Sequence, residues 1–297
     1  MLARSFAESD PPFAPVALVS DLSVEATPAS PLEQEVFPHH TDAIPPGVLD
    51  AGAYQLRFAW TRSDLHAAQA LRYRVFNEEL GEGLAGASST GLDADERDPW
   101  FHHLMICHRE SGEVVGTYRL QTAVMAATRH GFYSASLFEL GAIPGAILND
   151  AIEVGRACVA PAHRSGRVLR LLWRGLARYL QWNEKRYLFG CCSLPGVDVE
   201  TARNAWRVIH ARNVLHDRVI VRPRNSARAL ADDGRLRPVT TVDALTAPLT
   251  PLFDGYLSMG ARVCSAPAVD REFGTIDFLV LLDVRELDER THRALFA

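Results

Sequence analysis

The alternation of apolar and polar residues along the chain predicts which segments form strands and which form helices. Segments in which apolar residues recur at every second position, or run without a break, are typical of β-strands. They occupy residues 54–60, 101–110, 113–123, 151–161, 187–194, 263–270 and 274–284. Segments with apolar residues three and four positions apart are typical of amphipathic helices, and they occupy residues 63–80, 164–186, 199–213 and 251–261.

The order of these segments predicts the fold class. Strands interleaved with helices indicate an α/β (α+β) layer architecture, in which helices flank a mixed central sheet. The second and third strands are joined by a short turn at Ser111 and Gly112, so they pair antiparallel. Strands separated by a whole helix are free to run parallel, so both kinds of neighbour are expected in one sheet. Ser63 is positioned to cap the first helix.

The first 50 residues differ from the rest of the chain in composition. They are rich in Pro, Ala, Ser and Glu, and a segment of this kind buries too little apolar surface to offset the entropy lost on ordering. We therefore predict a disordered tail at residues 1–50 and a folded domain at residues 51–297, with order beginning near Tyr54. The early apolar run is short and broken by prolines, which is unlike a signal peptide.

Composition and charge exclude several classes of protein. The chain has 297 residues, 47% of them hydrophobic, which is ample for a large core, and no segment is long and apolar enough to span a bilayer. A net charge of −5 argues against nucleic-acid binding. Five cysteines without a CxxC pair indicate reduced thiols in a cytoplasmic protein and no structural metal. The eleven histidines have no metal-like companions. None has Asp four or five positions later, so the catalytic His–Asp pairs of the condensation-type and phosphatidate-type enzymes are absent.

One carboxylate and one acidic loop are candidates for chemistry. Glu153 lies on an otherwise apolar strand, where a charge is costly unless it is paired or has a function. An ion pair with Arg156 or Arg119 is the structural alternative. Asp95 and Asp98, together with Asp93 and Glu96, lie in a long loop, and by residue type alone they are equally typical of a solvated turn.

The helix at 164–186 carries a second signal. At 100° per residue, Arg167, Arg170, Arg174 and Arg178 share one face, and Leu169, Leu172, Trp173, Leu176 and Leu180 share the opposite face. The arginine face contains no acid, which in a net-negative protein favours a negatively charged partner. An acidic carrier protein is one such partner, anionic lipid headgroups are another, and a merely solvated face is the structural alternative.

The strand at 151–161, the loop and the long helix resemble the core of the GNAT N-acyltransferase fold. A GNAT phosphate loop ordinarily reads Q/R-x-x-G-x-G/A, whereas residues 164–169 read RSGRVL with one glycine. Since that loop holds the pyrophosphate of coenzyme A, its absence favours an acyl donor carried on acyl carrier protein. The acyl-homoserine lactone synthases, which share this fold and donor, have four short motifs that this chain resembles in order. These are Arg72…Phe76, Asp95…Asp98, Gly116-Thr117-Tyr118-Arg119-Leu120 and Glu153-Val154-Gly155-Arg156.

Seven further segments are similar to the ornithine-acyl-ACP N-acyltransferase family, which makes lyso-ornithine lipid and was once described as haemolysin-like. They include RYRVFNEELG, EVGRACV, YLFGCCS and the late PLFDGYLSMGARVCSAPAVDREFGTIDFLVLLD. The similarity extends from about Tyr54 to the C-terminus. The lactone synthases do not usually carry the late segment, which favours the ornithine family.

The resemblance implies a function and assigns roles to the candidate residues. It implies transfer of a 3-hydroxyacyl group from acyl-ACP to the α-amino group of L-ornithine, with Glu153 as the general base and no metal or further cofactor. It implies a substrate site at Arg72, Arg74, Phe76, Asp95, Asp98, Arg119 and Arg156. The acidic loop would receive the ammonium groups of ornithine, and the arginines would receive its carboxylate. Acyl-ACP is expected to dock on Arg164, Arg167, Arg170, Arg174 and Arg178.

The resemblance also implies where the protein works. A cytoplasmic enzyme with peripheral contact to the inner membrane, acting before a separate O-acyltransferase, fits lyso-ornithine lipid synthesis. Two alternatives remain at this point. One is another N-acyl amino acid synthase or an acyl-homoserine lactone synthase with the same donor. The other is an inactive module that binds a carrier protein or a membrane.

Overall fold

A nine-stranded mixed sheet organises the residues that the computed structural model describes, which are 36–230 and 249–296. Its strands follow the order β1-β2-β3-β4-β5-β6-β9-β7, with β8 paired to β9. β5 and β6 run parallel, and the other pairs of this sheet run antiparallel. The strands are β1 Leu49–Ala51, β2 Tyr54–Phe58, β3 His102–His108, β4 Val114–Thr122, β5 Ala151–Val159, β6 Tyr187–Pro195, β7 Arg262–Val263, β8 Ala268–Asp270 and β9 Thr275–Asp283.

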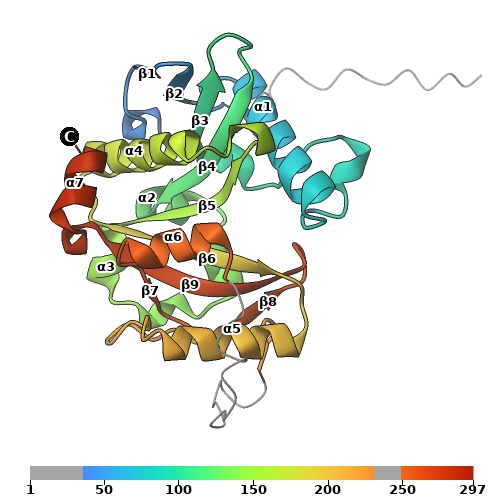
Figure 1. The fold of residues 1–297 in the computed structure, drawn as a ribbon, viewed down its shortest axis with the longest axis vertical. Coiled ribbons are helices and arrows are strands. Elements are labelled where there is room, and N and C mark those ends of the chain that lie inside the picture. Colours follow the sequence, from blue (N-terminus) through green and yellow to red (C-terminus); the bar gives the residue numbers. More distant parts are fainter. Residues whose placement is uncertain (1–35, 231–248, 297) are drawn as a thin grey trace, which may run out of the picture. The chain divides into compact units, whose positions relative to one another are not determined.

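The helices lie on both faces of this sheet (Figure 1). They are α1 Arg62–Arg72, α2 Ala123–Thr128, α3 Gly145–Asn149, α4 Arg167–Trp182, α5 Val199–Ala211, α6 Pro251–Ser258 and α7 Glu289–Phe296. α1 starts at a capping box, in which Thr61 and Asp64 satisfy each other's backbone N–H groups, so the cap is Thr61 and not the predicted Ser63. The chain continues from α1 into a π-helix at Tyr73–Glu79.

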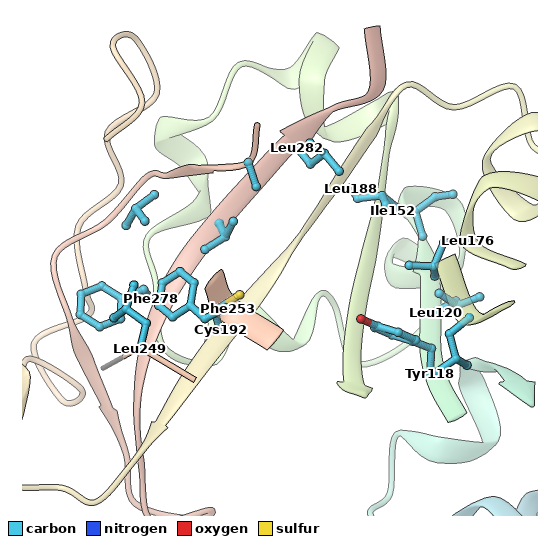
Figure 2. Packing of buried hydrophobic residues seen from close by; sticks show 14 of the residues in the cluster. Tyr118, Leu120, Ile152, Leu176, Leu188, Cys192, Leu249, Phe253, Phe278 and Leu282 are labelled. Atoms are coloured by element: carbon cyan, nitrogen blue, oxygen red, sulfur yellow. The ribbon is translucent and has the colours of Figure 1, made fainter. Parts of the chain in front are cut away.

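The alternation of side chains along each strand separates two cores. On β3, Leu104 and Ile106 point into the larger core, together with α4, α5 and α6, while Met105 and Cys107 point toward α1. Figure 2 shows the larger core extending from Tyr118 on β4 to Phe278 on β9. The opposite face of β6 and β9 is covered mainly by residues 132–148 and 219–227. The polar residues described below lie on this second side of the sheet.

α4 packs across β2, β3 and β4 (Figure 1). Its buried residues include Val168, Leu171 and Tyr179 beside the expected leucines, whereas Leu169 and Trp173 are only partly buried. The buried face is therefore rotated from the predicted one. The ring of Trp173 packs instead against Gly255 of α6, so a second helix covers the flank that the sequence pattern assigned to the sheet.

The sheet opens between its two parallel strands. β5 and β6 pair only over three positions, ending at Glu153 opposite Phe189, and beyond that point the two strands separate. β5 also bulges where two residues, Arg156 and Ala157, oppose Tyr118 of β4, and Arg156 adopts a positive φ of 49°. A bulge bends a strand and redirects its side chains. We call this opening between β5 and β6 the fork.

Gly190 sits at the point of the fork. A Cβ atom on Gly190 would lie 2.2 Å from the backbone oxygen of Val154, a contact that only separation of the strands relieves. We therefore expect Gly190→Ala to lower the free energy of unfolding by about 1–3 kcal/mol, the usual cost of overpacking. Urea denaturation measures this change. Gly155→Ala is the matched control, because Gly155 has open space at its Cβ position, and an equal loss in both variants would contradict the explanation.

Three sequence predictions about the fold need correction. The tail predicted for residues 1–50 ends too late, because Thr41–Ala43 form a 3₁₀ turn, Ile44 is buried and β1 pairs with β2; residues 1–35 lie outside the described part. The strand predicted at 263–270 is two short strands, β7 and β8, which both pair with β9. The helix α7 was not predicted. No helix within the described ranges combines the length and apolar character needed to cross a membrane.

Candidate active site

Three arginines and three aspartates form a buried charge network beside the fork. Arg72 of α1 binds Asp93 and Asp98, and its Nε atom lies 3.0 Å from Asp93 Oδ1. Arg119 of β4 binds Asp98 at 3.0 Å and also pairs with Asp95. Arg156 completes the set by pairing with Asp93. Because α1, the loop, β4 and β5 each contribute to it, the network fixes the long acidic loop against the sheet.

Burial and the neighbouring arginines have opposite effects on the pKa of the aspartates in this network. Burial alone would raise the pKa of Asp98, but the guanidiniums of Arg72 and Arg119 hold it well below its usual range. Burial would also raise the pKa of Asp95, but the charge of Arg119 outweighs burial, so the pKa of Asp95 is lowered as well. Asp95 and Asp98 are therefore charged, and arginines together with backbone N–H groups already occupy their oxygens. The sequence suggested that these two acids receive the ammonium groups of a substrate, and this arrangement places them poorly for that role.

The bulge aims Arg156 into an aromatic clamp. Its guanidinium lies 4.3 Å from the ring centre of Phe76 and 4.2 Å from that of Phe273, in addition to its pair with Asp93. Stacked guanidinium groups of this kind are held in position by cation–π attraction. Arg156 and Phe76 were both predicted as site residues, and the structure brings them into contact.

Glu153 lies at the fork and is held by backbone donors. Its two carboxylate oxygens accept the N–H groups of Tyr133 at 2.8 Å and Ser134 at 2.7 Å. The Gln121 amide, with its nitrogen oriented as a donor, lies 3.1 Å from Glu153 Oε2. Burial raises the pKa of Glu153, although the N–H donors favour its charged form. The ion pair with Arg156 or Arg119, considered from the sequence, does not form.

The turn between β8 and β9 lies over the same region. Asp270 accepts the hydroxyl of Tyr133, and Phe273 stacks on Arg156, as described above. Asp277 of β9 accepts hydroxyl hydrogen bonds from Ser193 of β6 and from Thr275, the latter at 3.0 Å. Burial raises the pKa of Asp277 to about 7. The late sequence segment, used above only to recognise a family, therefore supplies residues to the site.

The remaining predicted residues lie outside the network. Arg74 is half-exposed and pairs with Glu113 at 3.0 Å, so the structure does not bring it to Arg72, Arg119 and Arg156. Arg164 pairs through two hydrogen bonds with Glu79 of the π-helix, at 2.5 and 2.7 Å.

The arginine face of α4 is present as expected. Arg167 and Arg170 are exposed, while Arg174 and Arg178 are half-buried. Arg178 donates to the backbone oxygen of Pro46. Within residues 36–230 and 249–296, no ion pair engages any of these four arginines. Arg167 and Arg170 line a surface pocket of about 370 Å³ together with Tyr54 and Ser165.

Two buried histidines beside the network have structural partners. His102 bonds the Tyr179 hydroxyl at 2.7 Å and the backbone oxygen of His39 at 2.8 Å, and His103 bonds the backbone oxygen of Asp98 at 2.9 Å. Burial lowers the pKa of both His102 and His103 to about 4. Both are therefore neutral near pH 7. His103 helps to anchor the acidic loop, and His102 links α4 to the backbone of His39.

Sequence reasoning did not assign roles to several residues of the site. Tyr133, Ser134 and Gln121 were missed because nothing in a single sequence places a loop backbone next to Glu153. Asp277 carried a usable signal, since a lone acid inside the apolar run of β9 has the same anomaly that singled out Glu153.

Comparison with known proteins identifies the fold and the family. A family model described as an acetyltransferase (GNAT) domain matches residues 71–174, which confirms the predicted fold class. The chain is 33% identical over 254 residues to the L-ornithine N(alpha)-acyltransferase of Agrobacterium fabrum, covering 80% of this chain and 84% of that protein. It is 34% identical over 246 residues to the protein of the same name from Rhizobium meliloti, covering 80% and 82%. Among solved structures, the AHL synthase LasI aligns with 13% identity and a TM-score of 0.44, over 82% of this chain and 94% of that chain.

Proposed function

Because the chain belongs to the L-ornithine N(alpha)-acyltransferase family, we propose that it transfers a 3-hydroxyacyl group from acyl-ACP to the α-amino group of L-ornithine. The observation that carries this proposal is the identity of 33% across 84% of a protein named for the N-acylation of ornithine. The 3-hydroxyacyl group and the acyl-ACP donor are proposed from the sequence motifs. The product is lyso-ornithine lipid, which a separate O-acyltransferase would complete. The same membership favours this reading over the lactone synthases and over an inactive binding module.

Glu153 is the proposed general base. The α-amino group arrives protonated near neutral pH and must lose a proton before its nitrogen attacks the thioester. Glu153 is buried at the fork, and its carboxylate is oriented by the N–H groups of Tyr133 and Ser134. Each carboxylate oxygen accepts more than one hydrogen bond, so these donors leave capacity for the amine, directly or through a water molecule.

The fork supports a site for the donor's phosphopantetheine arm. Beyond Glu153 and Phe189 the β5 and β6 edges no longer pair with each other, and backbone groups there can bind the amides of an extended arm as a strand would. N–H groups of β5 are then available to stabilise the oxyanion of the tetrahedral intermediate. The donor brings its own prosthetic group, so the proposed reaction uses no metal and no further cofactor.

The charge network would build the acceptor site without binding the acceptor's ammonium groups. Arg72 and Arg119 hold Asp95 and Asp98, and this interaction fixes the acidic loop beside Glu153. Arg156, clamped between Phe76 and Phe273, lies nearest to the C-terminal turn and is the arginine that we assign to the acceptor carboxylate.

Product identity tests the proposed function. The purified protein is incubated with 3-hydroxyacyl-ACP and, separately, with ornithine, lysine, glycine or S-adenosylmethionine, and the products are analysed by mass spectrometry. We expect an N-acylated product with ornithine. A lactone product, or activity with glycine alone, would contradict the proposal. Replacing acyl-ACP by the matching acyl-CoA tests the donor, which should be used poorly.

The arginine face of α4 is the proposed docking surface for acyl-ACP, in a cytoplasmic enzyme at the inner membrane. Arg170→Glu with Arg174→Glu should lower kcat/KM for acyl-ACP by about 10-fold or more at low salt, because charge complementarity accelerates association. The KM for ornithine should not change. Steady-state kinetics at increasing salt concentrations measures both effects.

Arg218→Glu is the control for this prediction, since Arg218 is an exposed arginine in the loop after α5. It should leave carrier-protein kinetics unaltered. If the α4 variant keeps its carrier-protein kinetics but loses binding to vesicles of anionic phospholipid, then the face binds a membrane surface, and the carrier-protein assignment is wrong.

A further inference from the structure

Asp277 is a buried carboxylate for which the proposed mechanism has no use so far. Its side chain accepts hydrogen bonds from the Ser193 and Thr275 hydroxyls. The groups that face it from neighbouring elements are Asp270 of β8, Cys191 and Cys192 of β6, Glu82 of the acidic loop and Tyr133 of residues 132–148. No Lys, Arg or His in the described ranges pairs with Asp277. A carboxylate without a counter-cation is held most cheaply with a proton on it.

Ser193 connects this buried group to the fork. Thr275 is buried, whereas Ser193 is exposed, so a proton leaving Asp277 toward the open side passes through the Ser193 hydroxyl. A hydroxyl donates and accepts at once, which allows it to relay a proton. Ser193 is the direct cross-strand partner of Asp277. Ser193 lies four residues beyond Phe189 on the part of β6 that no longer pairs with β5, and the bulge of β5 lies a similar number of residues beyond Glu153.

Glu153 and Asp277 face charges of opposite sign. Burial raises the pKa of both, but Glu153 is oriented by N–H donors and faces Arg119, which favour a charged carboxylate. Asp277 faces the carboxylates of Asp270 and Glu82, which favour a neutral one and oppose the effect of the Ser193 and Thr275 hydroxyls. Ser134 lies between the two regions, since it donates its N–H to Glu153 and accepts the thiol of Cys191, two residues from Ser193, at 3.6 Å. Two carboxyl groups whose environments favour opposite protonation states are typical of a base and an acid acting in one reaction.

We propose that Ser193 and Asp277 form the general-acid pair that protonates the sulfur of the departing thiol, an assignment that rests on the proposed acyl transfer. The substrate ammonium group first gives one proton to Glu153, which releases it to solvent. In its protonated form Asp277 donates its O–H to the Ser193 oxygen. As the C–N bond forms and the C–S bond breaks, Ser193 gives its proton to the sulfur and takes the proton of Asp277, and Glu153 takes the second proton of the nitrogen. Solvent then returns a proton to Asp277 and removes one from Glu153, which restores both groups.

Asp277→Asn tests this assignment, because it keeps the shape of the side chain and removes its acidity. We expect kcat for acyl-ACP to fall by about 10²-fold or more, the usual contribution of a general acid, while the KM for ornithine stays within about threefold. A general acid is active when protonated. Wild-type kcat should therefore fall as pH rises through the pKa of about 7, and this alkaline limb should be absent in Asp277→Asn.

The leaving group provides a readout that a structural role would not move. An aryl thioester of the same acyl chain releases a weakly basic thiolate, which needs no protonation to leave. The deficit of Asp277→Asn should shrink at least tenfold on this donor, and Ser193→Ala should show the same pattern with a smaller deficit. Thr275→Val is the matched control, because it removes the other hydroxyl bond but leaves the route through Ser193 intact. Since that bond lowers the pKa of Asp277, its loss should move the alkaline limb to higher pH.

The possible outcomes distinguish failure of the proposed function from failure of the general-acid assignment. A wild-type protein that does not acylate ornithine overturns the proposed function and this inference with it. An active wild type with equal deficits on both donors overturns the inference alone and assigns Asp277 to stability. An increased KM for ornithine with unchanged kcat also overturns it, because Asp277 would then bind the acceptor's side-chain ammonium group.

Discussion

Replacing Glu153 by Gln should lower kcat for N-acylation of ornithine by about 10²- to 10⁴-fold, the range that a positioned general base contributes. The amide keeps the size of the carboxylate, and its oxygen still accepts an N–H group from Tyr133 or Ser134, but it takes up no proton. Binding of acyl-ACP should be unchanged, because the proposed docking surface lies on α4. Single-turnover assays with a labelled acyl chain, alongside a carrier-protein binding assay, measure the two quantities separately.

The role of Glu153 as a base also predicts how the rate changes with pH. Burial raises the pKa of Glu153 above its ordinary value, and a base is active only when it has lost its proton. The wild-type rate should therefore fall as pH decreases through that raised pKa, and the remaining activity of Glu153→Gln should lack this acidic limb. Glu139→Gln is the control, since Glu139 is an exposed residue a few positions from Tyr133 and Ser134. Full activity in Glu153→Gln would show that Glu153 is not the general base.

The sequence predicted the sheet well where the strands are long and mostly buried. The strands β2, β3, β4, β5, β6 and β9 lie within or close to their predicted ranges, because both of their faces are covered and their apolar runs are long. The apolar pattern of β5 also pointed to Glu153, because a charged residue is costly on a buried strand. The sequence pattern missed β1 and α7, which are short and lie at the edge of the fold. Ile44 shows why the tail was extended too far, since one buried residue among prolines produces no pattern.

The sequence did not reveal which charged residues pair with each other across the fold. Asp95 and Asp98 were recognised as important, but a single chain does not reveal that Arg72 and Arg119, distant in sequence, already neutralise them. The role of these acids therefore changes from binding a cationic substrate to holding a loop in place. Asp277 illustrates the same limit, because its meaning depends on Ser193, 84 positions away.

Asp98→Asn should be the most destabilising conservative substitution in the charge network. Asp98 binds both Arg72 and Arg119, and all three side chains are almost completely buried. Removing one partner leaves buried guanidiniums with incomplete compensation, which typically costs about 3–5 kcal/mol. Urea denaturation should show this loss in the free energy of unfolding. Asp50→Asn, which removes an exposed partner 3.8 Å from Arg109, should change stability by less than about 1 kcal/mol.

The difference between wild type and Asp98→Asn should itself depend on pH. The pKa of Asp98 is depressed in the folded state, so its contribution to stability is complete above the unfolded value of about 3.9 and is lost as pH falls toward the folded value. His102 and His103, whose folded pKa of about 4 lies below the unfolded value, destabilise both proteins between about pH 6.5 and 4. Above about pH 4 this loss is nearly the same in both proteins and cancels in the difference; below it His103, whose pKa the charge of Asp98 raises, contributes differently to the two proteins. The gap between the two proteins should therefore stay nearly constant above about pH 4 and narrow below it, and a gap independent of pH down to about pH 2 would show that the charge of Asp98 is not what the arginines require.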